Sequence, residues 1–199
     1  MKKVILGFSI VFIMAGCNGE EGKDQPFKKE EQIYTTESPN PIKKEPSSPK
    51  EKKLKVTVEG FTEIRTGTLQ ESDLGYSLYI LDGFSLEQEE PGRDLLFYEN
   101  DDSFFVRISK LDSEIHYDEI KKNLLNSSKN VIEENPETLA EASFKDAEFY
   151  LIDADNYISI IAKEFDGQNY LFSIHMPLKE AAEGVGPNIW AMLSTFVIQ

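Results

Sequence analysis

Residues 54–199 are predicted to fold as an α+β domain in which helices cover an antiparallel β-sheet. Two observations predict this class. Short segments of alternating apolar and polar residues recur with turn-forming residues between them, and longer segments show the apolar period of an α-helix. Because no strand–helix–strand repeat occurs, consecutive strands are expected to pair as hairpins.

The first part of this region contains strand patterns. Alternation begins at 55–59 and is clearer at 75–81. Segments 94–98 and 103–108 flank Glu99-Asn100-Asp101-Asp102, whose Asn and Asp residues suit a tight turn. These two segments are therefore predicted to form a hairpin.

A helix is predicted from about Glu114 to Val131, capped by Asp112 or Ser113. Its apolar residues recur at spacings near 3.6, so one face should lie on the sheet. A second, short helix is predicted over 137–142, because Pro136 is acceptable in a first helical turn. The apolar positions of the first helix and its end are Ile120, Leu124, Leu125, Val131 and Ile132.

Three further strands are predicted over 147–152, 157–165 and 170–176. Asp166-Gly167 lies between the last two strands and supplies the residues of a reverse turn, so this is the strongest hairpin signal in the chain.

The C-terminal segment is predicted to be a helix from Asn188 to about Val197. Gly184-Val185-Gly186 is expected to break any helical turn before it, and Pro187 can open the helix. The core stripe of this helix would be Ile189, Trp190, Leu193, Phe196 and Val197.

The order and hydrophobic positions of these segments resemble those of the PsbP-like and DcrB-like family, small exported or lipid-anchored α+β proteins. The likeness covers most of residues 75–199. It is carried by Gly83-Phe84-Ser85-Leu86, by 165–172 before Met176-Pro177, and by 189–196. The resemblance implies an α+β fold and no catalytic residue, because members of such a group act as accessory, stress-related or assembly proteins.

The predicted domain is strongly acidic. Residues 54–199 contain 11 Lys and Arg against 28 Asp and Glu, a net charge of −17. This balance argues against nucleic acid as a partner, since no basic surface can displace phosphate counterions. It also opposes direct contact with an anionic membrane leaflet, whereas a cation or a basic partner would be attracted.

Residues 1–16 have the layout of a secretory signal peptide. Lys2 and Lys3 precede an apolar segment from Val4 to Ala15, which is too short to span a bilayer comfortably as a permanent helix. The mature chain is therefore expected to be exported.

Met14-Ala15-Gly16-Cys17 resembles the lipobox of bacterial lipoproteins, in which an aliphatic residue and two small residues precede a cysteine. The resemblance implies that the Cys17 sulfur receives a diacylglyceryl group and that cleavage makes Cys17 the first residue. Cys17 is the only cysteine, so no disulfide can form within the chain. Two acyl chains, at about 0.8 kcal/mol per buried CH₂, anchor a protein stably. An ordinary secretory signal with an incidental cysteine and an uncleaved anchor are the alternatives.

Residues 17–53 are predicted to be a lipid-anchored, disordered linker. Segment 19–53 has five prolines, eight lysines, eight acidic residues and almost no aliphatic residues. Such a composition cannot bury enough apolar surface to offset its ordering entropy. A flexible chain of about 36 residues spans roughly 30–36 Å, so the domain of residues 54–199 should stand clear of the lipid headgroups.

No motif in the sequence indicates catalysis, a cofactor or a metal ion. His116 and His175 are far apart and lack an HExxH-like spacing. Gly184-Val185-Gly186-Pro187-Asn188 precedes a predicted helix, as phosphate-binding loops do, but lacks the Walker lysine and is interpreted as an ordinary loop. The protein is therefore not expected to be an enzyme.

Acidic clusters are interpreted as solvated charge and turn residues. Glu87-Gln88-Glu89-Glu90 and 99–102 lack the ligand pattern of a calcium loop, and 153–156 is followed by Ile158 where that loop needs glycine. Four aromatic residues of the first predicted hairpin are expected in the core and in cross-strand pairs, with an exposed recognition surface as the alternative. They are Phe97, Tyr98, Phe104 and Phe105.

The sequence therefore predicts a lipoprotein held by Cys17 on the extracytoplasmic face of the cell membrane. Its domain is expected to be a non-catalytic binding or accessory module with a protein partner in the bacterial envelope. An envelope hydrolase that uses paired carboxylates and a cation-binding sensor are the alternatives.

Overall fold

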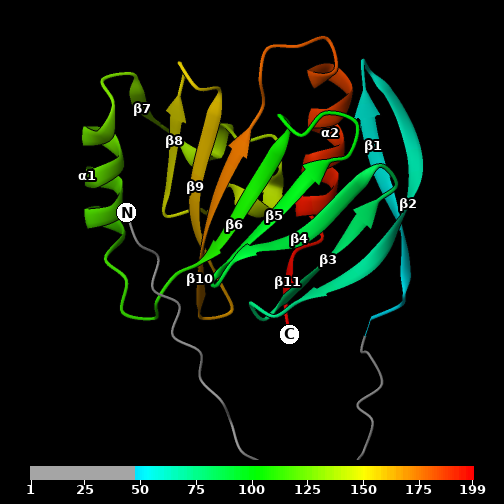
Figure 1. The fold of residues 1–199 in the computed structure, drawn as a ribbon, viewed down its shortest axis with the longest axis horizontal. Helices are drawn as coiled ribbons and strands as arrows, with labels where there is room; N and C mark the ends of the chain where they lie inside the picture. Colours follow the sequence, from blue (N-terminus) through cyan, green and yellow to red (C-terminus); the bar gives the residue numbers. More distant parts are fainter. Residues whose placement is uncertain (1–47) are drawn as a thin grey trace, which may run out of the picture. The chain divides into compact units, whose positions relative to one another are not determined.

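The structure, a computed structural model, describes residues 48–199, which form two antiparallel sheets with helices at their sides (Figure 1). The first sheet has the strand order β1-β2-β3-β11 and the second the order β4-β5-β6-β10-β9-β8-β7. The strands are β1 (Glu51–Val58), β2 (Phe61–Ser72), β3 (Tyr76–Leu81), β4 (Phe84–Glu90), β5 (Arg93–Tyr98), β6 (Phe105–Lys110), β7 (Val131–Glu134), β8 (Phe149–Asp153), β9 (Ile158–Phe165), β10 (Gln168–His175) and β11 (Val197–Ile198). The helices are α1 (Tyr117–Ser127), α2 (Ala182–Leu193) and the short 3-10 helices η1 (Pro136–Thr138) and η2 (Ala142–Phe144).

The predicted fold class, an α+β domain with helices covering one sheet, is wrong. The described residues form a mostly β structure with two sheets in a β-sandwich-like arrangement. Leu78 of β3, Leu96 of β5 and Phe172 of β10 are fully buried and belong to one core, so strands of both sheets cover each other's apolar faces. Only α1 and α2 are α-helices within residues 48–199, and neither is long and apolar enough to cross a membrane.

The two hairpins predicted with turn signals are confirmed. Strands β5 and β6 pair antiparallel, as do β9 and β10. Asp166 and Gly167 have φ values of 47° and 79°, the positive values that a type I′ turn requires at both central positions. Strand β1 begins at Glu51, within the segment predicted as linker, and β2 was not predicted at all.

Helix α1 is shorter than the predicted segment from Glu114 to Val131. Val131 instead begins β7, because it pairs with Asp153 at the edge of the second sheet. Helix α1 has no buried residue, and its Ile120 packs on a small apolar cluster at the β7 end of that sheet. The predicted helix over 137–142 is replaced by η1 and η2.

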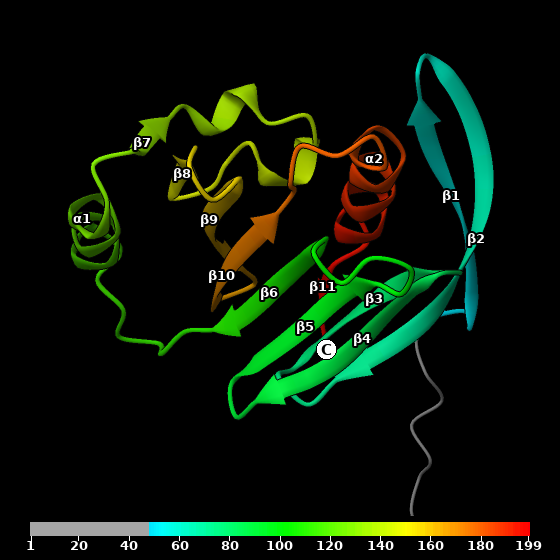
Figure 2. The ribbon, with the colours of Figure 1, turned by 45° about the horizontal axis from the view of Figure 1, so that its top comes forward.

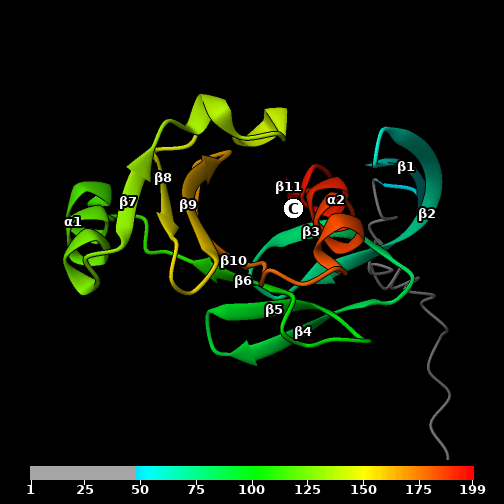
Figure 3. The same cartoon turned by 90° about the horizontal axis from the view of Figure 1, so that it is seen from above.

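Helix α2 begins six residues before the predicted start at Asn188 and ends at Leu193. Gly186 lies inside it because the site has no room for a side chain: a Cβ there would lie 2.6 Å from Met176 Cε. Burial of α2 against the core therefore overrides the helix-breaking residues at 184–187. Figure 3 shows α2 between the β1–β2 hairpin and strands β9 and β10.

Residues at and after the C-terminal end of α2 also complete the hydrogen bonding of β3. Strand β11 pairs with Tyr76 and Ser77 only. Farther along β3, the backbone N–H of Tyr79 donates to Thr195 Oγ1 at 2.9 Å, and that of Leu81 donates to Met192 Sδ at 3.3 Å. These side chains occupy an edge that would otherwise expose unpaired donors.

Buried tyrosines predict a loss of stability at high pH. Burial raises the pKa of Tyr170 from 10.0 to about 12, and it raises the pKa of Tyr76 further. The folded state therefore favours the neutral phenols, and their stabilising contribution is complete below pH 10 and is lost as the pH rises toward 12. We expect the urea midpoint to fall over this range.

Tyr170→Phe is the matched variant for this prediction. It removes one of the titrating phenols, so its urea midpoint should fall less steeply than that of the wild type between pH 9.5 and about 12. Equal slopes for the two proteins would contradict the assignment.

Candidate functional site

The residues that the sequence singles out lie on different elements or outside the described part of the chain. The predicted signal peptide (1–16), Cys17 and the predicted linker up to residue 47 lie outside the described residues. His116 is the N-cap residue of α1, and His175 lies on β10, where its Nδ1 donates to the backbone oxygen of Ser103 at 2.6 Å. Within residues 48–199 no three His, Cys, Asp or Glu side chains form a group that could hold a metal ion.

The aromatic residues of the β5–β6 hairpin divide between the two faces of the sheet. Phe104 is fully buried, and Tyr98 packs on Phe84 with their ring centroids 5.2 Å apart. Phe97 and Phe105 are half-buried on the other face, where they are cross-strand partners. The expected core packing is therefore confirmed for Phe104.

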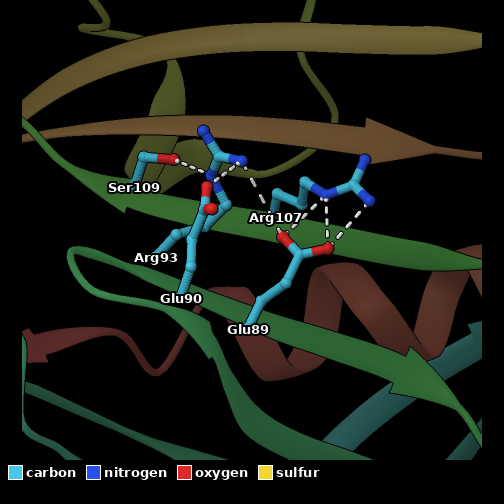
Figure 4. Close-up of polar contacts among 5 residues, drawn as sticks. All are labelled: Glu89, Glu90, Arg93, Arg107 and Ser109. Carbon is cyan, nitrogen blue, oxygen red and sulfur yellow. Dashed lines mark hydrogen bonds and ion pairs between the residues drawn. The ribbon is translucent and has the colours of Figure 1, made fainter. Parts of the chain in front are cut away.

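The acidic cluster at Glu89 and Glu90 is part of an ion-pair network on the same open face (Figure 4). A β-bulge between Gln88 and Glu90 interrupts the register of β4 with β5. The Glu89 carboxylate accepts hydrogen bonds from Arg107 Nε and Nη2 at 2.8 to 3.0 Å, so it reaches from β4 to β6. These hydrogen bonds lower the pKa of Glu89 and raise that of Arg107.

Arg93 completes this network. Its Nη1 lies 2.5 Å from Glu90 Oε1, and its Nε donates to Ser109 Oγ at 3.2 Å. Two arginines thus face two glutamates, and the network as a whole is neutral. All four side chains are at least a quarter exposed, so the expected contribution of each pair is below about 1 kcal/mol. The network aligns three strands and offers no uncompensated charge to a ligand.

A depression of about 580 Å³ at the N-terminal end of α2 is the better candidate for a site, and we call it the α2 depression. The tip of the β1–β2 hairpin, the β3–β4 turn, the segment after β5 and the start of α2 line it. Figure 1 shows the tip of the β1–β2 hairpin beside the upper end of α2, where this helix begins. Its lining residues are Val58, Glu59, Arg65, Asp82, Gly83, Phe84, Tyr98, Asn100, Glu180, Ala181, Glu183, Gly184, Val185 and Asn188.

Arg65, in this depression, connects the β1–β2 hairpin to α2 through hydrogen bonds. Its Nη1 donates to Asn188 Oδ1 at 2.8 Å, and its Nη2 donates to Glu63 Oε2 at 2.7 Å. Asn188 is 4% exposed, and its Nδ2 donates to the backbone oxygen of Gly184 at 2.8 Å. The guanidinium is therefore oriented and neutralised by its neighbours. Figure 2 shows how far the hairpin projects from the rest of the first sheet.

A second ion pair holds the loops beside the depression. Lys179 Nζ lies 2.7 Å from Asp101 Oδ2 and donates to Ser103 Oγ at 2.7 Å. The hydrogen bond from Lys179 lowers the pKa of Asp101 to about 2, so this carboxylate is ionised at any physiological pH. The pair connects the segment after β5 to the loop before α2.

The remaining charge of the depression is negative. Glu59, Asp82, Glu180 and Glu183 are exposed at its rim, and Arg65, already paired with Glu63, is the only basic residue that lines it. Four carboxylates at one concave surface attract cationic groups and lower the affinity for anions.

Two exposed apolar side chains each lie two residues along the chain from a carboxylate of this rim. Phe61 is 77% exposed and lies opposite Val58 at the tip of the hairpin. Leu178 is 81% exposed, two residues before Glu180. The floor includes buried Phe84 and Val185. Acidic groups beside exposed apolar ones suit a ligand that is both basic and apolar.

The structure thus presents a mostly β domain in which the α2 depression has an acidic rim. Residues 48–197 match the model of a family described as a domain of unknown function (DUF8580). The chain belongs to this family. The match runs from β1 to the first residue of β11, so the DUF8580 domain includes both sheets and all the helices described above. None of the curated proteins matches the chain.

Sequence reasoning missed the α2 depression in the DUF8580 domain. Its rim carboxylates come from three segments, the β1–β2 turn, the β3–β4 turn and the start of α2, and each resembles an ordinary surface residue in the sequence. Three of them precede a glycine, and two of these pairs, Glu59-Gly60 and Asp82-Gly83, lie between consecutive strands. That pattern indicates two tight turns. Only the pairing of the strands brings those turns to the same end of the molecule.

Proposed function

We propose that the protein is a lipid-anchored, extracytoplasmic binding protein whose α2 depression takes a basic segment of an envelope partner, without catalysis. The observation that carries this proposal is the acidic rim of the depression beside Phe61 and Leu178. The sequence of residues 1–17 supports the anchor.

Charge decides the class of partner. Residues 54–199 carry a net charge of −17, so long-range attraction favours a basic partner and raises its association rate. Net charge alone would attract a basic partner to the whole surface of the domain. The α2 depression provides a specific binding position, because Glu59, Asp82 and Glu183 surround one concavity with an apolar floor. A segment with alternating basic and apolar side chains meets both features.

The anchor predicts a clear change in location when its sulfur is removed. Cys17→Ser eliminates the nucleophile that would carry the lipid, so the variant should lose radiolabelled palmitate and leave the membrane fraction. Labelling and fractionation of cells that express each form would measure this. Equal labelling of the variant and the wild type would contradict lipidation at Cys17.

The binding surface predicts a charge-dependent affinity. We expect the full-length protein, purified in a non-ionic detergent, to bind a fluorescent heptapeptide in which lysine alternates with leucine and phenylalanine. Glu59→Asn combined with Asp82→Asn should raise its Kd about tenfold at low salt, a loss of about 1.4 kcal/mol. Both changes keep residues that suit their turns, since asparagine tolerates the positive φ of 49° at Glu59. Fluorescence anisotropy measures the affinity.

A matched control separates the depression from the general acidity of the domain. Glu164→Gln with Asp166→Asn removes two carboxylates, one at the end of β9 and one in the β9–β10 turn. In Figure 1 this turn lies at the lower end of the second sheet, away from the start of α2. This control should change the Kd less than twofold. An equal loss for both double variants would show nonspecific attraction and would overturn the proposed site.

A further inference from the structure

One face of the β1–β2 hairpin carries lysines and uncharged side chains. Cross-strand partners share a face of a sheet, so the pairing of β1 with β2 places six side chains together there. Lys53 Nζ donates to Thr66 Oγ1 at 2.6 Å, in agreement with this placement. The hydroxyls of Thr57 and Thr62 lie 3.0 Å apart. We call this surface the lysine face, and its residues are Lys53, Lys55, Thr57, Thr62, Ile64 and Thr66.

The opposite face of the hairpin is the one that packs on α2, which contacts β1. Leu54 and Val56 are buried there, and they alternate along β1 with the lysines of the lysine face. The lysine face therefore points outward, and its residues are exposed except for the half-buried Thr66. Ile64, which is 57% exposed, lies directly across from Lys55.

The charge of β1 is opposite to that of the rest of the domain. Residues 50–58 contain four lysines and one acid, a net charge of +3, whereas residues 59–199 contain 10 Lys and Arg against 28 Asp and Glu, a net charge of −18. None of these four lysines forms an ion pair with another residue of 48–199, so the positive charge of β1 is not neutralised there. The basic residues that do form ion pairs in this part of the chain are Arg65, Arg93, Arg107, Lys121, Lys163 and Lys179.

We propose that the lysine face docks on the anionic phospholipid surface of the membrane to which Cys17 is anchored, an inference that rests on the lipid anchor of the proposed function. The net charge of the whole domain opposes such contact, but a Debye length of about 8 Å at physiological salt screens the more distant carboxylates. Because β1 is the first described element after Cys17 in the chain, the anchor would hold its lysines at a high effective concentration near the headgroups. Ile64 adds apolar area for the headgroup boundary.

Docking in this way leaves the α2 depression accessible. Val58 and Arg65 line that depression, and they lie on the opposite face of the hairpin from Lys55. A domain docked through the lysine face therefore presents the depression to a partner instead of to the lipid. Lysines on an edge strand also discourage pairing with another molecule, but that role requires no exposed isoleucine beside them.

The test uses the lipidated full-length protein in vesicles of phosphatidylcholine, with or without about 30% phosphatidylglycerol as the anionic lipid. Thr62→Cys supplies a thiol for an NBD fluorophore on the lysine face, since the sulfur of Cys17, the only native cysteine, would carry the lipid. We expect NBD emission to rise about twofold on the anionic vesicles and to return to the neutral-vesicle value in 1 M salt, where charges are screened. The same label at Ile132→Cys, on β7, should not respond. Flotation with neutral vesicles reports the anchor separately.

Charge variants assign the docking to this face. Lys53→Gln with Lys55→Gln should lower the ratio of docked to undocked protein, taken from the NBD emission, about tenfold, since each lysine near an anionic surface contributes a factor of up to about five. Lys122→Gln with Lys129→Gln removes two exposed lysines elsewhere and should change the ratio less than twofold.

The double variant at 53 and 55 should keep the circular dichroism spectrum of the wild type and, in detergent, bind the heptapeptide within about twofold of it. A loss of peptide binding with docking intact would therefore concern the α2 depression alone. Four results would overturn the proposal: equal emission on both kinds of vesicle, a rise that survives the changes at 53 and 55, an equal loss in the control pair, or the same rise when soluble polyphosphate is added to neutral vesicles.

Discussion

Phe144→Ala should lower the free energy of unfolding by about 3–5 kcal/mol. Phe144 lies on η2 and is 0% exposed. Its ring centroid is 5.0 Å from that of Phe172, 5.8 Å from that of Phe165 and 5.9 Å from that of Trp190. Truncation removes these edge-to-face contacts and leaves a cavity between the second sheet and α2.

Urea denaturation followed by circular dichroism measures this loss. Phe61→Ala is the matched control, because it makes the same truncation at a residue that is 77% exposed. Its unfolding free energy should change by less than about 0.5 kcal/mol. If both variants lost the same small amount, η2 would not be packed into the core as described.

Gly67→Ala should destabilise the protein by about 1–3 kcal/mol. Strand β2 pairs with β1 up to Thr68 and with β3 from Gly67 onward, so Gly67 lies where the strand passes from one partner to the other. A Cβ at this position would lie 2.9 Å from Tyr79 Cβ and 3.3 Å from Leu54 Cδ1. The first contact is with an atom next to the backbone, which cannot move without shifting β3.

Gly184→Ala is the control, and it is expected to leave the stability unchanged or to raise it. It makes the same chemical change in α2, where an added Cβ meets nothing within 4 Å. Because alanine favours a helix over glycine by up to about 1 kcal/mol, this variant should be as stable as the wild type or more stable. Thermal unfolding of the two variants tests the pair, and a loss at residue 184 equal to that at residue 67 would contradict the close contact.

Local turn chemistry was predictable from the sequence. Asp166-Gly167 specified the β9–β10 hairpin, because few residue pairs adopt two successive positive φ values. Segment 75–81 was also predicted well, since β3 is one of the most buried strands. Both signals depend on neighbours in the sequence and need no knowledge of the rest of the fold.

Long-range packing decided the elements that were missed or misplaced. Strand β2 is exposed over residues 61–64, on both of its faces, because the β1–β2 hairpin projects from the sheet, and it therefore lacks the alternation of a half-buried strand. Gly184 and Gly186 were predicted to break the helix and Pro187 to open it, but close contact of α2 with Met176 requires a glycine at 186. The predicted layer of helices over one sheet failed for a related reason, since the core consists of apolar residues from both sheets together with those of α2.

The candidate site could not be predicted because its residues become neighbours only in the fold. Asp82 and Glu183 are separated by about a hundred residues in the sequence and line one depression. Cys17 differs, because its predicted role depends on a contiguous motif. The sequence therefore predicts that the protein is anchored to the membrane, and the structure indicates which ligands the domain of residues 48–199 could bind.

Site-specific photocrosslinking in living cells tests the central claim most directly. The full-length protein would carry p-benzoylphenylalanine in place of Phe61, the exposed cross-strand partner of Val58, or in place of Ile132, which is exposed on strand β7. We predict a light-dependent adduct from position 61 only, mapped to a basic segment of its partner and lost with Glu59→Asn and Asp82→Asn. The account would be contradicted by equal adducts from both positions, by an adduct at 61 that survives the charge substitutions, or by no adduct at 61.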